Sequence, residues 1–275
     1  MHLDGLRSFE AIYADRRGEQ RGTRVHRLER LTAMEKPALR FTVTMHGRGI
    51  VEDELTFDAT NGAPLARRIF APSLLHRVET WNGNTVDWVD IAIDGSGATN
   101  HGRQFDTLPL TMPPELLAAA LALEPGDRHF VPSFSTDLGA DAPGFLLALE
   151  ALKHETITTP AGTFECLRVR TEMRTLTADP TEAAPLGLPA RTLWIQNEAP
   201  YLVRAAAEMQ GVELSQELEQ VRWLGPASAA TGDAENPERS TDALQAEAST
   251  DHATGHGLLH RLVDWFHGLH GHVRF

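Results

Sequence analysis

Hydrophobic and polar residues alternate through most of residues 1–224, with the period of two that is typical of half-buried β-strands. Residues 41–46 (FTVTMH) and 51–58 (VEDELTFD) both follow this alternation. Asn82-Gly83 lies between two further runs of the same kind and predicts a tight hairpin, because both residues tolerate the positive φ of a type I′ turn. The pattern therefore predicts many antiparallel strands joined by short turns.

A segment rich in leucine and alanine interrupts the strands at residues 112–127 (MPPELLAAALALEPGD). Its early prolines and its final Pro-Gly are start and stop signals of a helix, and Leu116, Ala120 and Leu123 would form the buried stripe. We expect a mainly β fold class, an antiparallel half-barrel or strongly curved sheet with this one central helix. Such an arrangement covers both the sheet edges and the apolar stripe of the helix.

The composition changes after residue 224. Residues 225–254 contain six acids, one base and a single large apolar residue, Leu244. Such a segment cannot bury enough apolar surface to offset the entropy of ordering it, so we expect a disordered acidic linker. Apolar periodicity returns in residues 255–275, which predicts a His-rich amphipathic helix. The expected organisation is a β half-barrel domain at 1–224, the linker, and this tail.

Charge and composition exclude several classes of protein. The formal net charge of −13 disfavours nucleic-acid binding, which needs a basic face. No run of about 18 apolar residues predicts a transmembrane segment. The first 22 residues lack the apolar core of a signal peptide, so we expect a cytoplasmic protein or one whose leader is absent from this sequence. No phosphate-binding, dinucleotide-binding or zinc-protease motif occurs, and no cofactor is expected.

The single cysteine, Cys166, lies in the stretch HETITTPAGTFECLRVRTEM, residues 154–173. Pro160 and Gly162 predict a hairpin turn between two strands. Cys166 falls on the opposite face from Leu167 and its alternate neighbours, so either both faces are covered or a bulge near Cys166 shifts the phase. His154 on the paired strand makes a Cys–His dyad conceivable. The alternative, which we favour, is a buried cysteine that packs as a small apolar residue.

The tail contains a candidate metal site. On a helical wheel His256, His260, Asp264 and His267 share one face, and His256 and His260 have the i, i+4 spacing that can bind zinc or nickel. The alternative is an amphipathic helix whose polar face is rich in histidine. Its apolar face could dock on the main domain, a partner or a membrane surface.

Four large residues on predicted strands are candidate ligand-binding residues: Phe57, Trp81, Trp88 and Trp194. Together they could line a concave apolar pocket for an apolar small molecule or lipid. Packing in the core is the commoner role of such residues.

Several segments carry a family resemblance. TITTPAGTFECLRV, RTLWIQNEAPYLVRAAAEM, PELLAAALALEPGDRHFVPSF and GVELSQELEQV resemble a bacterial domain-of-unknown-function family of β-rich envelope proteins with a "PAGTF" hairpin. The resemblance covers residues 10–223. It implies a fold similar to that of the periplasmic lipoprotein carriers, an open half-barrel, and a location in the periplasm or cell envelope. The family has no agreed catalytic residues, so the resemblance implies none here.

These observations favour a non-enzymatic binding or scaffold protein that holds an apolar or acyl ligand on a concave β-sheet. One alternative is a hydrolase or metal-dependent enzyme that uses the tail histidines or the His154/Cys166 pair. Another is a structural component of the envelope or of an assembly. The sequence does not decide among these functions.

Overall fold

The computed structural model describes residues 3–46, 50–71, 75–92, 96–139, 141 and 143–224. These residues form strands, one α-helix and three short 3-10 helices. The strands are β1 (Phe9–Arg17), β2 (Gln20–Ala33), β3 (Lys36–His46), β4 (Ile50–Asp58), β5 (Pro64–Ala71), β6 (Leu75–Asn82), β7 (Thr85–Ile91), β8 (Ala98–Gln104), β9 (Arg128–Ser133), β10 (Phe145–Thr159), β11 (Gly162–Thr175), β12 (Arg191–Ile195), β13 (Leu202–Met209) and β14 (Val212–Trp223). The helices are α1 (Pro114–Leu121), η1 (Leu3–Gly5), η2 (Thr136–Leu138) and η3 (Pro180–Glu182).

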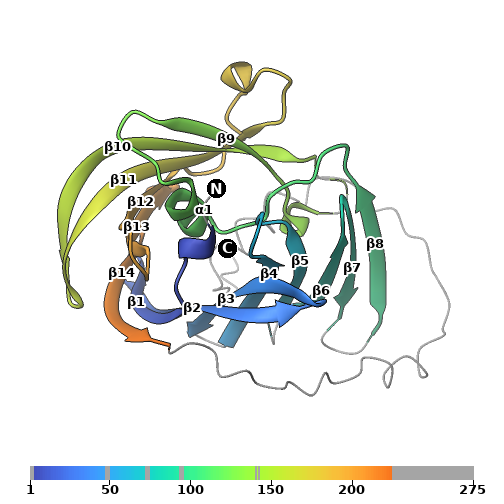
Figure 1. The fold of residues 1–275 in the computed structure, drawn as a ribbon, viewed down its shortest axis with the longest axis horizontal. Coiled ribbons are helices and arrows are strands. Elements are labelled where there is room, and N and C mark those ends of the chain that lie inside the picture. Colours follow the sequence, from blue (N-terminus) through green and yellow to red (C-terminus); the bar gives the residue numbers. More distant parts are fainter. Residues whose placement is uncertain are drawn as a thin grey trace, which may run out of the picture.

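All of these strands belong to one antiparallel, 14-stranded sheet. Its order is β8-β7-β6-β5-β4-β3-β2-β1-β14-β13-β12-β11-β10-β9. Every pair of adjacent strands except β1 and β14 is consecutive in the sequence, and the consecutive strands β8 and β9 lie at opposite edges. The edge strands β8 and β9 do not pair with each other, and the sheet is not closed. Figure 1 shows the sheet curving from β8 through β1 and β14 to β9, with α1 on its concave side. The predicted fold class, a curved antiparallel sheet with one central helix, is confirmed for the described residues.

Irregular pairing accompanies this curvature. The register shifts at four places, and a bulge at each increases the local bend and twist of the strand. The shifts lie between Ile12 and Tyr13, Thr56 and Phe57, Ala151 and Lys153, and Trp194 and Ile195. A sheet bent in this way has a concave face that α1 can cover.

The helix forms where the sequence predicts it. Pro114 is its first residue, and Ala122, in the left-handed conformation with φ 50°, ends it before the predicted Pro-Gly stop. The predicted stripe of Leu116, Ala120 and Leu123 is buried in the main core, with Leu117 beside it. Because these side chains fill the concave face, the helix anchors the interior of the half-barrel.

Both predicted hairpins are present. Asn82 pairs with Thr85 across a turn in which Gly83 has φ 58°. Thr159 pairs with Gly162 across the predicted Pro-Ala turn. Of the two explanations offered for the phase of β11, the structure favours coverage of both faces, because Cys166 and Leu167 are both buried. The register shift of this hairpin places its extra residue on β10, between Ala151 and Lys153, and leaves the phase of β11 unchanged.

Candidate binding cavity

A cavity of about 370 Å³ lies on the concave face of the sheet, beside the N-terminal end of α1. Its size falls in the range of about 300–1,000 Å³ that small-molecule sites occupy. Most of its lining is apolar and comes from strands on both sides, including Phe41, Val43, Met45, Leu55, Phe145 and Leu147. The interior of the half-barrel is therefore not completely filled by its own side chains.

Charged side chains of β1 and β2 and the amide of Gln216 on β14 line one side of this cavity. Arg24 donates to Asp15 at 3.0 Å, and both residues line the cavity. With the amide of Gln216 oriented so that its oxygen faces Arg24, this oxygen accepts from Arg24 Nε at 2.6 Å and Nη1 at 2.8 Å. The guanidinium of Arg24 is therefore well satisfied by neighbouring residues.

His26 and Glu115 form a buried pair next to this group. His26 Nδ1 lies 3.7 Å from Glu115 Oε1, and the imidazole contacts the rings of Tyr13 and Phe41, with centroids 4.6 and 5.2 Å away. Burial, reinforced by the charges of Arg24 and Arg191, holds the pKa of His26 well below its ordinary value. His26 is therefore neutral at neutral pH, and its buried Nε2 atom has no hydrogen-bond partner among the described residues.

Arg191 differs from the other cationic side chains of the interior. It is the first residue of β12 and shares the inner face with Leu193 and Ile195, which are buried in the core. It lines the cavity but makes no hydrogen bond or ion pair with the described residues. Burial lowers the pKa of Arg191, with Glu115 acting in the opposite direction, yet an arginine side chain keeps its charge in proteins. Arg191 is thus a cation that the described residues leave without a hydrogen bond or ion pair, although the Glu115 carboxylate acts on it from a longer distance.

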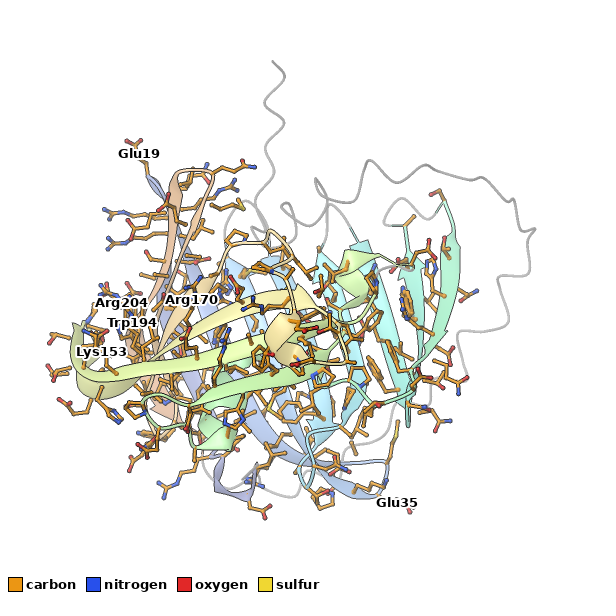
Figure 2. The ribbon with its side chains drawn as sticks, turned by 90° about the horizontal axis from the view of Figure 1, so that it is seen from above. Glu19, Glu35, Lys153, Arg170, Trp194 and Arg204 are labelled. Carbon is orange, nitrogen blue, oxygen red and sulfur yellow. The ribbon has the colours of Figure 1, made fainter. Side chains whose placement is uncertain are left out.

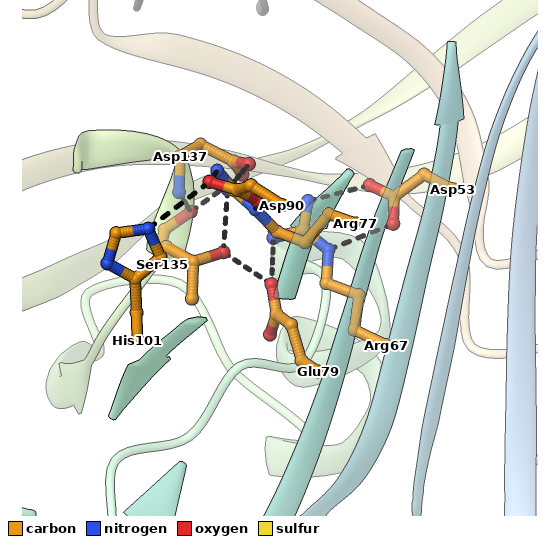
Figure 3. A network of polar contacts seen from close by, with 9 residues as sticks. Asp53, Arg67, Arg77, Glu79, Asp90, His101, Ser135 and Asp137 are labelled. Atoms are coloured by element: carbon orange, nitrogen blue, oxygen red, sulfur yellow. Dashed lines mark hydrogen bonds and ion pairs between the residues drawn. The ribbon is translucent and has the colours of Figure 1, made fainter. Parts of the chain in front are cut away.

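An ion network lies on the opposite wall and is drawn in Figure 3. Asp137, on η2, accepts from two arginines, with Oδ2 2.9 Å from Arg67 and Oδ1 3.1 Å from Arg77. Arg67 also donates to both oxygens of Asp53 at 2.9 and 2.8 Å, and Arg77 donates to Asp90. The network connects η2, which follows edge strand β9, to strands β4 to β7.

Glu79 lies in the middle of this network. It accepts a hydrogen bond from Thr136 and lies 3.6 Å from Arg67. Burial raises the pKa of Glu79, and the nearby Asp137 carboxylate raises it further, against the opposing effect of Arg67. The network on this wall contains four carboxyl groups, those of Asp53, Glu79, Asp90 and Asp137, and two guanidinium groups, those of Arg67 and Arg77.

An aromatic cluster adjoins the network. Phe134, directly after β9, packs against Phe105, Trp81 and Trp88, with ring centroids at 4.8, 6.3 and 6.3 Å. Trp81 and Trp88 come from β6 and β7, close to the other edge of the sheet. We call this aromatic cluster and the Asp137 network the seam, since they join the two edge regions through side chains.

The four predicted ligand-binding residues occupy different places. Trp81 and Trp88 lie together in the seam, and Phe57 is buried in the main core. Trp194 lies on the other face of the sheet, where its Nε1 donates to Glu155 and Arg204 stacks 5.8 Å from the ring (Figure 2). The residues that line the cavity include none of the four. Their role in ligand binding stays a prediction.

The polar residues that do line the cavity were missed by the sequence reasoning. Arg24 and His26 alternate in phase with the buried Leu28, and Arg191 alternates in phase with Leu193. Charged residues on the apolar phase of a strand are the signal that could have identified them.

Cys166 and His154 do not form a dyad. Cys166 is 0% exposed and pairs with Glu155, whereas His154 pairs with the next residue, Leu167, and has a side chain that is 57% exposed. Burial raises the pKa of the Cys166 thiol to about 12, and the carboxylates of Glu165 and Glu155 act in the same direction. The thiol therefore lacks the properties of a nucleophile.

Cys166 should accordingly resist alkylation. A rise in the pKa from 9.0 to about 12 lowers the thiolate fraction near pH 8 by roughly a thousandfold, since each pKa unit is a factor of ten. We expect iodoacetamide to label the native chain at least a hundredfold more slowly than the urea-unfolded chain, as followed by intact mass. Equal rates in the two states would show that the thiol is accessible and contradict this placement.

The predicted metal ligands His256, His260, Asp264 and His267 lie outside the described residues, as do the linker and the tail. Within the described ranges, no three His, Cys, Asp or Glu side chains are grouped as metal ligands would be. Nor does this part of the chain contain a helix of the length and hydropathy needed to cross a membrane.

Comparison with known proteins identifies the fold. No protein-family model and no curated protein matches the sequence. The structure is similar to the β-barrel-like protein of domain of unknown function DUF1849 from Brucella abortus, with a TM-score of 0.50 and 12% identity over 80% of this chain and 99% of that one. The predicted resemblance to β-rich bacterial proteins of unknown function is thus confirmed for the fold.

Two weaker similarities concern lipoproteins. A candidate lipoprotein from Parabacteroides distasonis has a TM-score of 0.36 and 14% identity, over 79% of this chain and 96% of that one. The hypothetical lipoprotein YmcC from Escherichia coli has a TM-score of 0.30 and 13% identity, over 81% and 88%. At TM-scores this low we draw no conclusion from either protein.

Proposed function

We propose that this chain is a non-enzymatic binding protein that holds the acyl chain of a ligand in the cavity on its concave face. The observation that carries the proposal is the cavity of about 370 Å³, which is lined mainly by apolar side chains and lies inside the curved sheet. Transfer of an acyl chain from water into such a space is favourable by about 25 cal/mol for each Å² of apolar surface buried.

The distribution of polar groups supports binding rather than catalysis. The Cys166 thiol is buried, its pKa is raised, and His154 points elsewhere. An enzyme that uses these two residues is therefore disfavoured by their geometry.

A location in the cell envelope, which the family resemblance implies, belongs to the same proposal. Fractionation of cells that produce the full-length protein from its own gene would test this location.

Binding is tested with phenylnaphthylamine, an uncharged probe that fluoresces in apolar sites, and with myristyl alcohol as competitor. We expect the full chain to bind the probe and the alcohol to displace it. Native mass spectrometry of the same sample should show the alcohol bound at one equivalent. Absence of both probe binding and alcohol binding would overturn the proposal.

A space-filling substitution should abolish this binding. Val43 lies on the inner face of β3 and lines the cavity, so Val43→Trp places an indole where the acyl chain would lie. We expect probe affinity to fall at least tenfold. Thr44→Trp is the matched control, because Thr44 is the next residue of β3, faces the other side of the sheet and does not line the cavity. Equal binding by the two variants and the parent would place the ligand elsewhere.

A further inference from the structure

We infer that Arg191 receives the head of the ligand, and that the preferred ligand is a monoanionic amphiphile with a carboxylate head. The inference rests on the proposed function and goes beyond it by naming the chemical class of the ligand. Its starting point is that Arg191 lines the cavity without a hydrogen bond or ion pair among the described residues. A buried charge without a partner is costly, and a ligand anion would remove that cost.

Two other arginines of these walls, Arg24 and Arg67, already have carboxylate partners, whereas Arg17 lies at the end of β1 near the mouth of the cavity. Arg24 binds Asp15 and Gln216, and Arg67 binds Asp53 and Asp137. The positive charge of each of these two arginines is already balanced by a neighbouring carboxylate, so each gains less from an incoming anion. The chemistry of the walls thus points to Arg191 as the group that gains most from an incoming anion.

The charges around Arg191 favour a single negative charge on the ligand. On this side of the cavity the ionised lining residues on the inner phase of their strands or on α1 are Arg17, Arg24 and Arg191 against Asp15 and Glu115, which is three positive charges and two negative ones. Arg16 and Arg21 also border the cavity, but they lie on the outer phase of β1 and β2 and are exposed to solvent. The neutral state of His26 leaves this balance unchanged. One carboxylate neutralises the excess, whereas a phosphate dianion would leave a negative charge beside Glu115.

The opposite wall directs the head toward Arg191. There, Asp53, Glu79 and Asp137 face the cavity with Arg67 as the cation among them. A carboxylate head would be repelled from this wall and attracted to the other. The planar guanidinium of Arg191 matches a carboxylate with two parallel hydrogen bonds, and the apolar strands between the two walls are left for the acyl chain.

The test compares three competitors of the same chain length against the phenylnaphthylamine probe at neutral pH. We expect myristic acid to displace the probe from the full chain at about a tenfold lower concentration than myristyl alcohol, with myristyl phosphate weaker than the acid. If acid and alcohol are equally effective, the inference fails while the proposed function stands. If the phosphate is the strongest, the carboxylate preference is wrong. If no competitor displaces the probe, the proposed function itself fails.

Arg191→Met removes the charge and retains an unbranched side chain. We expect the affinity for myristic acid to fall about ten- to a hundredfold, the range for loss of a charged hydrogen bond, with that for the alcohol unchanged. Arg170→Met, at an exposed position on β11, is the matched control and should alter neither. An equal loss for acid and alcohol in a variant that keeps the parent melting temperature would show that Arg191 has no headgroup role. Should Arg191→Met not fold, the comparison of acid with alcohol in the parent chain decides.

Discussion

Substitution of Asp137 by alanine is expected to lower the free energy of unfolding by about 3–5 kcal/mol, the usual cost of removing one partner of a buried ion pair. Asp137 is shared by Arg67 and Arg77 at 2.9 and 3.1 Å, and its side chain is only 2% exposed. Its loss leaves two buried guanidinium groups short of an acceptor and releases η2 from the sheet. Urea denaturation of the full chain, followed by circular dichroism, measures the effect.

Asp87→Ala provides the matched control. Asp87 is on β7, within the same part of the sheet, but it is exposed and outside the network. Its substitution should change the free energy of unfolding by less than about 0.5 kcal/mol. A similar small effect for Asp137→Ala would mean that the network contributes little and that η2 is held by other contacts.

Substitution of Phe134 by alanine is expected to cost about 3–5 kcal/mol, as is usual when a buried phenylalanine is truncated and leaves a cavity. Phe134 is 3% exposed and packs against Phe105, Trp81 and Trp88. These rings come from strands and loops near the opposite edge of the sheet, so the truncation also weakens the attachment of the segment after β9. The same denaturation experiment measures it.

Phe70→Ala is the control for this substitution, because Phe70 is 48% exposed and its truncation leaves no internal cavity. We expect Phe70→Ala to lower the free energy of unfolding by less than about 1 kcal/mol.

The double variant Phe134→Ala/Asp137→Ala tests whether the two parts of the seam stabilise the fold together. Both residues attach the same segment to the sheet. The double variant should therefore lose less unfolding free energy than the sum of the two single losses, by more than about 0.5 kcal/mol. Strict additivity would show that the two contacts act independently.

The local elements of this fold could be predicted because their signals are local. Alternation with period two identified strands such as β3 and β4, and the turn residues at Gly83 and Pro160 identified two hairpins. The helix was evident from its prolines and its leucine and alanine content. In each case the residues that determine the structure lie within a few positions of one another.

The cavity could not be predicted in the same way. The alternation places Asp53 on the same face as Leu55, but its partner Arg67 is on another strand, and Asp137 is far along the chain. Large aromatic residues were the natural candidates for a ligand pocket. The tertiary structure uses Trp81 and Trp88 for the seam, because they meet Phe134 there, and it places Arg191 at the cavity.

Side-chain periodicity and local backbone preferences were enough to predict the helix, two hairpins and the inner phase of strands such as β3. Which strands lie next to each other depends on contacts between distant parts of the chain. The pairing of β1 with β14 joins segments from opposite ends of the described chain, and it brings Asp15 and Arg24 next to Gln216. The periodicity of a strand predicts which face of the sheet each side chain lies on, but not which side chains of other strands it contacts. Those contacts determine whether a buried charge has a partner.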